Sequence, residues 1–140
     1  MFDKAYIMTT PCSGKSTFVL LNENKYKSLY LFDHDAIKGE KDFQALNKLP
    51  TYSCIIGRNH KPNQKKYIYA IVLIEEEQLR KQIAKRKIQD PKNAWTEELI
   101  FNHPDGYYKL QQVAKEYNIP VFKTFEEALN FIIVKIIENE

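Results

Sequence analysis

Residues 9–17, TTPCSGKST, follow directly after the apolar run AYIM at residues 5–8. The stretch ends in the Gly-Lys-Ser of the phosphate-binding pattern G-x-x-x-x-G-K-[ST], but Thr9 stands where the pattern has its first glycine. That first glycine mainly permits a tight departure from the strand, whereas Gly14 must be small because backbone and phosphate come close there. We therefore expect a phosphate-binding loop rather than a plain turn, provided that Thr9 keeps a negative φ.

Length and composition indicate one domain over residues 1–140. With 44% hydrophobic and 28% charged residues, the chain is typical of globular proteins and is neither disordered nor fibrous. No apolar run reaches the ~18 residues of a membrane span, and the amino terminus, with Asp3 and Lys4, does not read as a secretory signal. Because Cys12 and Cys54 form no disulfide framework, we expect reduced thiols, a cytoplasmic location and no membrane partner.

Strand and helix patterns alternate along the whole chain. Short apolar runs predict strands at residues 5–8, 29–32, 53–56, 67–74 and 119–122. Periodic apolar residues and charge patterns predict helices at residues 14–22, 36–47, 75–88, from 96 to about 102, 107–117 and 125–137. This order predicts an α/β three-layer sandwich, in which a parallel, five-stranded sheet has helices on both faces.

Three finer expectations follow. The run YIYAIVLI at residues 67–74 is the most apolar and most β-branched, so we expect it to be a central strand. In the first helix, Phe18, Val19, Leu20 and Leu21 are expected to pack on the first strand. The last helix is apolar enough either to be largely buried or to form the interface of a homodimer.

The loop that follows the first strand has the groups that hold a nucleoside triphosphate. Successive backbone N–H groups and the positive end of the next helix face the anion, Lys15 reaches the terminal phosphates, and the Ser16 hydroxyl ligates Mg²⁺. We therefore expect ATP and Mg²⁺ as ligands. The loop residues that hold them are Pro11, Cys12, Ser13, Gly14, Lys15, Ser16 and Thr17.

The segment LFDHDAIK at residues 31–38 ends the second predicted strand in two carboxylates. Asp33 and Asp35 would lie at the carboxyl edge of the sheet, where open α/β sheets bind ligands. Asp35, or alternatively Asp33, can accept the proton of an attacking hydroxyl, and the other can hold magnesium-bound water. The structural alternative is that either residue caps the next helix. His34, between them, is expected at the surface.

The chain resembles the small P-loop kinases of the adenylate-kinase type, which include polynucleotide, gluconate and shikimate kinases and phage-encoded relatives. The resemblance rests on three segments in this order: TTPCSGKSTF, LFDHDAIK and the basic segment after YIYAIVLI. The resemblance spans most of the chain. It implies a P-loop NTPase fold of the nucleoside/nucleotide kinase type and an arginine-bearing lid after the fourth strand, here at about residues 80–95. In the polynucleotide-kinase-like branch, an Asp followed three residues later by a basic residue has a role comparable to the one described above for Asp35 and Asp33. Asp35 and Lys38 have this spacing.

Phosphoryl transfer also needs positive charge around the transferred group. Arg80 and Arg86 lie in the segment where the resemblance implies a lid, and Arg58 follows the third strand as an acceptor-side contact. For Arg80 the alternative is a solvated helix face with a Glu76–Arg80 pair. Residues 58–92 hold ten Lys/Arg against four acids, which suits phosphates, although a solvated Lys-rich face is the alternative.

These motifs predict an ATP-dependent kinase that moves a γ-phosphoryl group to a nucleotide, a nucleoside or a 5′-hydroxyl nucleic-acid end. The expected catalytic residues are Lys15, Asp35 and Arg86, the expected substrate contacts are Asp33, Lys38, Arg58 and Arg80, and the expected metal ligands are Ser16 and Asp33. The alternatives are a small-metabolite kinase of the gluconate/shikimate type and a nucleotide-binding interaction protein with little turnover. The second stays open because the third strand, CIIGRNH, lacks the acid that holds magnesium in many P-loop proteins.

Overall fold

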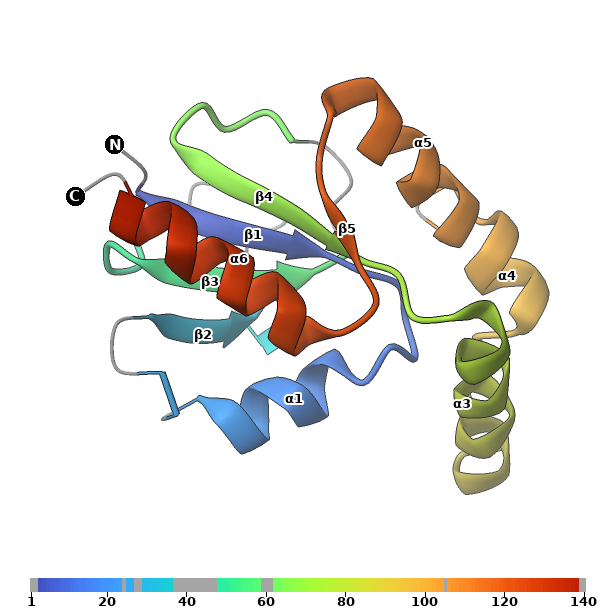
Figure 1. Cartoon of the computed structure of the whole chain (residues 1–140). Coiled ribbons are helices and arrows are strands. Elements are labelled where there is room, and N and C mark those ends of the chain that lie inside the picture. Colours follow the sequence, from blue (N-terminus) through green and yellow to red (C-terminus); the bar gives the residue numbers. More distant parts are fainter. Residues whose placement is uncertain are drawn as a thin grey trace.

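The five strands that the structure describes form one parallel sheet (Figure 1). The structure is a computed structural model, and it describes residues 3–23, 25–26, 29–36, 48–58, 62–104 and 106–138. The sheet order is β2-β3-β1-β4-β5. The strands are β1 (Lys4–Met8), β2 (Tyr30–Asp33), β3 (Ser53–Gly57), β4 (Tyr67–Val72) and β5 (Val121–Phe122). The predicted α/β class and the predicted five-stranded parallel sheet are confirmed, and each strand overlaps the run that predicted it.

The prediction that residues 67–74 form a central strand is confirmed, because β4 lies inside the sheet between β1 and β5, and the middle place of the five belongs to β1. All five residues of β1 pair with β3 on one side and with β4 on the other. An apolar, β-branched run indicates that a strand is buried on both of its faces. This is the case for β1 and for β4. Such a run does not show which buried strand has the middle place, because that depends on how the connections cross the sheet.

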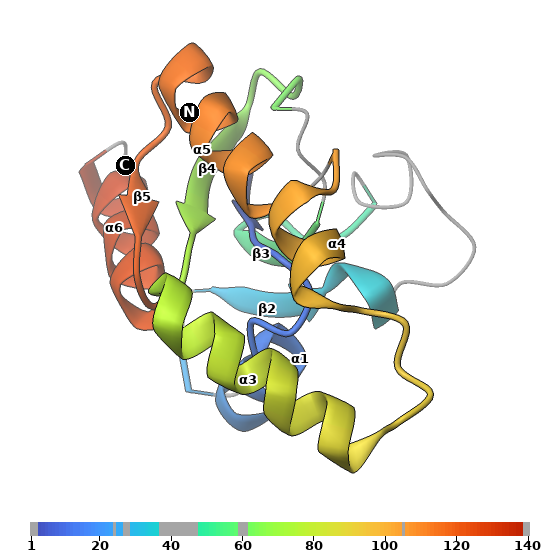
Figure 2. The same cartoon turned by 90° about the vertical axis from the view of Figure 1, so that its right-hand side faces the viewer.

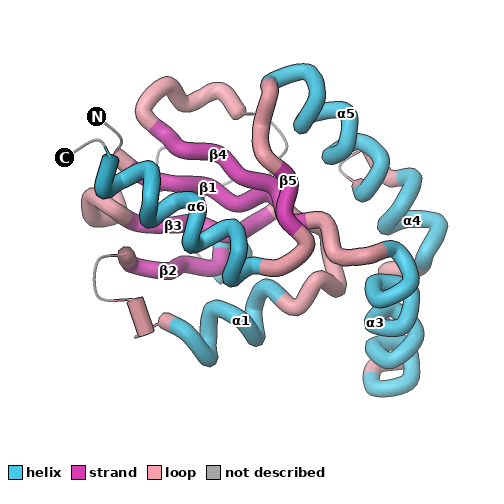
Figure 3. The backbone as a smooth tube through the Cα atoms, in the orientation of Figure 1, coloured by secondary structure: helices cyan, strands magenta, loops and turns pink. Residues whose placement is uncertain are grey.

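Side chains of β1 alternate between two apolar cores, one on each face of the sheet, so the fold is a sandwich of helices, sheet and helices. Tyr6 and Met8 face the core under α3 (Glu76–Gln89), α4 (Glu97–Asn102) and α5 (Tyr107–Tyr117). Ala5 and Ile7 face the core under α1 (Lys15–Asn22) and α6 (Phe125–Glu138). Figures 2 and 3 show α6 and the α4–α5 pair separated by the strands.

Helix α6 is buried against the sheet. Its residues Ala128, Leu129 and Ile132 have no exposed surface, and they belong to the same core as β1 and β3. Burial therefore accounts for the apolar residues on the inner face of this helix, whereas Val134 and Ile137 are exposed. Within the described residues, no helix combines the length and the apolar character that crossing a bilayer requires.

Helix α1 packs on the sheet through fewer residues than expected. Val19 is buried, but Leu20 and Leu21 are 71% and 75% exposed, so the expectation that both pack on the first strand is wrong. Lys15 and Val19 are one helical turn apart and face inward, and the next two positions consequently point toward solvent.

The helix expected at residues 36–47 and the candidate Lys38 lie outside the described residues, except that Ala36 ends the short 3₁₀ turn η1 (His34–Ala36). The helical stretch expected from residue 96 is confirmed as α4. Its first turn is capped by Thr96, whose Oγ1 accepts a hydrogen bond of 3.2 Å from the backbone N–H of Leu99.

The exposure of α1 gives a test of its packing. Leu20→Gln and Leu21→Gln should each change the free energy of unfolding by less than about 0.5 kcal/mol, because both side chains are in solvent. Val19→Ala should cost on the order of 2 kcal/mol, because it removes buried methyl groups. Urea unfolding of the three variants measures this, and a large loss for either leucine variant would contradict the described face.

Candidate functional site

Thr9 joins the end of β1 to both neighbouring strands. Its backbone N–H donates to the carbonyl oxygen of Gly57 on β3 at 2.9 Å, and its Oγ1 donates to the carbonyl of Val72 on β4 at 3.0 Å. The side chain is completely buried, and Thr9 is not among the described residues with positive φ. The condition set for Thr9 is therefore met. In addition, its hydroxyl makes a bond across the sheet that a glycine could not make.

The loop after Thr9 has the backbone shape of an anion cradle. Cys12 and Gly14 have positive φ values of 61° and 88°, and Ser13 lies between them. Left-handed residues beside right-handed ones turn successive N–H groups toward the same point. Gly14 is the N-cap of α1 and provides no side-chain cap, so the amides of the first helical turn are available to an anion. A Cβ on Gly14 would meet no atom within 4 Å, so φ rather than packing requires glycine there.

Lys15 and Ser16 connect this loop to the end of β2. The Lys15 Nζ lies 2.8 Å from Oδ1 of Asp33 and 2.7 Å from Oδ2 of Asp35, and its side chain is 8% exposed. The Ser16 hydroxyl donates to the other carboxylate oxygen of Asp33. The Asp35 backbone N–H donates to Oδ1 of Asp33 at 3.0 Å. The two predicted motifs thus form one hydrogen-bonded network.

The two carboxylates of this network differ in environment. Burial by itself would raise the pKa of Asp33, but the hydrogen bonds from Lys15 and Ser16 and the Lys15 charge outweigh burial, so the pKa lies below its usual value. Asp33 is therefore ionised at neutral pH, and its side chain is only 11% exposed. The Asp35 side chain is 53% exposed. Asp33 is suited to hold a cation, and Asp35 is the carboxylate that a second substrate can reach.

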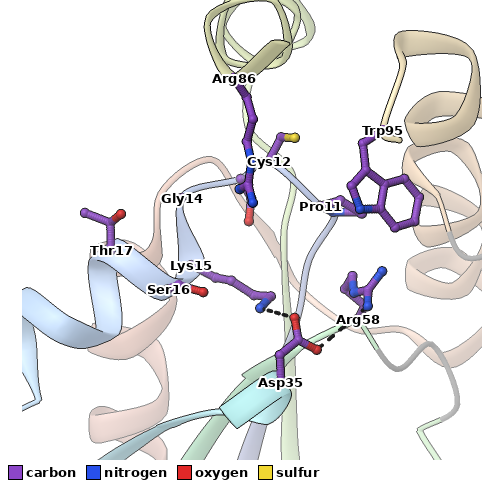
Figure 4. A pocket seen from close by; sticks show the side chains of 11 residues that line it. Pro11, Cys12, Gly14, Lys15, Ser16, Thr17, Asp35, Arg58, Arg86 and Trp95 are labelled. Atoms are coloured by element: carbon purple, nitrogen blue, oxygen red, sulfur yellow. Dashed lines mark hydrogen bonds and ion pairs between the residues drawn. The ribbon is translucent and has the colours of Figure 1, made fainter. Parts of the chain in front are cut away.

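A cavity of about 160 Å³ opens in front of the loop (Figure 4). It is lined by the loop residues Pro11, Cys12, Ser13, Gly14, Lys15, Ser16 and Thr17 together with Asp35, Arg58, Arg86 and Trp95. The Arg86 side chain extends from α3 toward the loop, and no hydrogen bond or ion pair holds its guanidinium among the described residues. Arg58 lies 3.8 Å from Asp35 and stacks on the Trp95 ring at 5.2 Å.

A second hollow, of about 530 Å³, lies on the other side of Gly14, between α1 and α3. It shares Cys12, Ser13, Gly14, Thr17 and Arg86 with the first cavity. Its remaining lining is partly apolar and partly amide or basic: Phe18, Leu21, Asn22, Gln82, Lys85, Gln89 and Phe125. Its size and mixed lining suit a planar polar ring that continues from a phosphate in the loop.

Arg80 does not line either hollow. Its guanidinium pairs with Glu97 at 2.7 Å and lies over the Phe101 ring at 4.2 Å, so it joins α3 to α4. The structure thus shows Arg80 in an ion pair at the surface of α3, as in the alternative stated for it, but the partner is Glu97 rather than Glu76. A different residue of α3 contacts the loop: the Gln82 side-chain amide donates to the Cys12 carbonyl oxygen at 2.8 Å. No spacing in the sequence pointed to Gln82.

His34 is half-buried, so the expectation that it lies at the surface is wrong. Its Nδ1 lies 2.6 Å from the hydroxyl of Tyr6, which is fully buried on β1. Burial lowers the pKa of His34 below its usual value, although the neighbouring Asp35 charge acts in the opposite direction. The imidazole is therefore neutral at physiological pH.

The remaining chemistry-bearing residues that the structure describes do not form a second centre. Burial raises the pKa of Cys12, although the Arg86 charge and the nearby Asn93 side chain oppose the rise, so this thiol is protonated and a poor nucleophile. Within the described residues, no three His, Cys, Asp or Glu side chains lie close enough together to hold a metal ion. A magnesium ion would therefore depend on the oxygen atoms of Ser16, Asp33 and the phosphates, which are the donor types that it prefers.

Compared with protein-family models and with curated proteins, the chain matches none of them. The loop after β1 and the residues around it are therefore the basis of the functional proposal below.

The lowered pKa of Asp33 predicts how acid acts on the network. Because the ionised form is favoured in the folded state, its contribution to stability is complete above the usual value of 3.8 and is lost as the pH falls below it. Asp33→Asn should therefore lower the Tm at pH 7, and the difference from the wild type should shrink steadily between about pH 5 and pH 2.5. Thermal unfolding followed by circular dichroism measures this. A difference that does not change with pH would contradict the described network.

Proposed function

We propose that the protein is an ATP- and Mg²⁺-dependent phosphotransferase of the P-loop kinase type, acting in the cytoplasm. The observation that carries this proposal is the meeting of four groups at a cradle of backbone amides: the Lys15 ammonium, the Ser16 hydroxyl and the carboxylates of Asp33 and Asp35. A loop that only turned the chain would not need a buried lysine and two acids beside it.

The charges at the cradle favour a triphosphate that arrives with a divalent cation. Lys15, Arg58 and Arg86 are opposed by Asp33 and Asp35, which leaves a net charge of only +1 for the five groups. When bound, Mg²⁺ would supply the missing positive charge at the phosphate oxygens, and Ser16 and Asp33 would hold it. Lys15 uses two of its three N–H donors on the carboxylates, so one remains for a phosphate oxygen.

The remaining residues supply the parts that transfer requires. Asp35 is half-exposed, lines the cavity and is oriented by Lys15, so it can accept the proton of an acceptor hydroxyl whose oxygen attacks the γ-phosphorus. The bond between the γ-phosphorus and the bridging oxygen breaks, and ADP leaves. Arg86 faces the loop from α3 without an anionic partner among the described residues, and it would neutralise charge on the transferred group. The second half of α3 and the segment to Trp95 are the proposed lid.

Arg58 and Trp95 favour a nucleotide, a nucleoside or a nucleic-acid end as the acceptor. They lie beside Asp35 and combine a guanidinium with an aromatic ring, which suit a phosphate and a base. A small sugar acid would use only the guanidinium. We favour turnover over binding alone because Asp33, at the end of β2, contacts Ser16 and so offers a carboxylate where β3 has none.

The test is transfer of radiolabelled γ-phosphate from ATP to nucleosides, nucleoside monophosphates, 5′-hydroxyl oligonucleotides, gluconate and shikimate. We expect labelling of an acceptor of the nucleotide class, and Asp35→Asn should lower kcat by about 10²–10⁴ while the Kd for MgATP stays within a few-fold. Equal labelling by Asp35→Asn would remove this residue from the role of base. Binding of MgATP in calorimetry with no labelled acceptor would favour the interaction protein, and no binding heat at all would overturn the proposal.

Two arginines of one helix give a matched pair. Arg86→Ala should lower kcat by about 10³-fold or more, since it removes charge next to the transferred group. Arg80→Ala removes the same type of side chain six residues earlier in the helix. Because Arg80 pairs with Glu97, its loss should change only the Tm. Steady-state kinetics of both variants measures the contrast. Similar kcat values for the two variants would show that Arg86 does not act on the transferred group.

A further inference from the structure

Tyr6 and His34 form a buried contact directly beneath the turn that carries the two acids. The Tyr6 ring is fully buried on β1, its hydroxyl lies 2.6 Å from His34 Nδ1, and the two rings meet edge to face at a centroid distance of 5.6 Å. His34 lies between Asp33 and Asp35 in the chain. A contact at His34 therefore acts on the backbone of both carboxylates.

Gly57 provides the space for this contact. A Cβ on Gly57 would overlap the Tyr6 hydroxyl oxygen and would come within 2.6 Å of the His34 Cβ. Gly57 ends β3 and stands in the segment where the third-strand acid of other P-loop proteins would be expected. The end of β3 thus has no room for a side chain, because the Tyr6–His34 pair fills it.

The buried Lys15 ammonium and the Ser16 hydroxyl hold Asp33 just before the turn, whereas the ionic contacts of the turn residue Asp35 lie closer to solvent. Asp35 is reached by Lys15 and, at 3.8 Å, by Arg58, but the Asp35 and Arg58 side chains are 53% and 39% exposed. Exposed ionic contacts hold a side chain weakly, whereas a hydrogen bond that involves a buried hydroxyl, with an aromatic contact beside it, defines one position. The Tyr6–His34 pair is accordingly the inner anchor of the turn.

We propose that Tyr6 and His34 are positioning residues that hold Asp35 in line with the acceptor hydroxyl, and Asp33 against Ser16, in place of a carboxylate on β3. The proposal rests on the proposed phosphotransferase function for its kinetic consequence. Its structural content, an ordered turn at His34–Ala36 that depends on the Tyr6 hydroxyl, can be tested without turnover.

The test variant is Tyr6→Phe, which removes the hydroxyl and keeps the ring. We expect kcat to fall about 10- to 100-fold, because small misplacements of a catalytic group cost up to about 10² in rate. The Kd for MgATP should stay within about two-fold, because main-chain groups of the loop make most of that site. By ¹⁵N relaxation, the order parameter of the Asp35 amide should fall from about 0.85, the value of rigid backbone, to below about 0.6.

Tyr69→Phe is the matched control. The Tyr69 ring is partly buried and lies 6.5 Å from the Tyr6 ring, and the Tyr69 hydroxyl accepts a hydrogen bond of 3.0 Å from the Gln64 backbone N–H. The variant loses a comparable bond that does not involve the turn, so kcat and the Asp35 order parameter should not change. His34→Asn keeps a polar atom close to the position of Nδ1 and should retain more activity and order than His34→Ala.

An Asp35 order parameter in Tyr6→Phe equal to that of the wild type, or equal effects of Tyr6→Phe and Tyr69→Phe, would overturn the positioning role. If the wild type phosphorylates no acceptor, the proposed function fails, but the order parameters still decide whether the pair fixes the turn. If Tyr6→Phe does not fold, as judged by its amide spectrum, the His34→Asn and His34→Ala pair supplies the same comparison.

Discussion

The ammonium group of Lys15 lies between two carboxylates from another part of the chain, and the candidate site depends on this buried ion network. An ammonium in a poorly solvated place is stable only when its charge is paired and its donors are used. Asp33 and Asp35 meet this requirement at 2.8 and 2.7 Å. The same contacts hold the loop after β1 against the end of β2, so the pairing that makes a buried lysine tolerable also brings the proposed metal ligand and the proposed base to the loop.

The strand order explains why these residues meet. From β1 the chain continues to β2 on one side of the sheet, whereas from β4, next to β1, it continues to β5 on the other side. Connections that leave adjacent strands in opposite directions open a crevice at the carboxyl edge, where open α/β sheets bind ligands. Four segments reach this crevice: the loop after β1, the turn after β2, Arg58 after β3 and α3 after β4. No element would form such a site by itself.

The residues that lie beneath the site are as informative as those that line the cavity. Thr9 replaces a glycine of the phosphate-binding pattern, yet it connects β1 to both neighbouring strands through its backbone and its hydroxyl. Gly57 ends a third strand that has no acid, and the space beside it is filled by Tyr6 and His34. Both departures from the pattern thus have a structural role, and neither leaves a gap in the packing around the loop.

Much of the fold could be predicted from the sequence because strands, helices and the phosphate loop depend on residues close together in the chain. Apolar runs located all five strands, and Gly14, Lys15, Asp33, Asp35, Arg58 and Arg86 could be chosen from their places at strand ends and in the basic segment. Apolar composition overstated the packing of Leu20 and Leu21, since helical direction, not hydrophobicity, decides which side chains face the sheet.

Only the tertiary structure decided the contacts that join distant segments. It placed β1 in the middle of the sheet, paired Arg80 with Glu97, and brought Gln82 to Cys12 across a separation of 70 residues and His34 to Tyr6 across 28. Local patterns contain no information on such pairs. Their formation depends on strand order and on the direction in which each side chain leaves its element, and both are settled only when the sheet and its helices pack together.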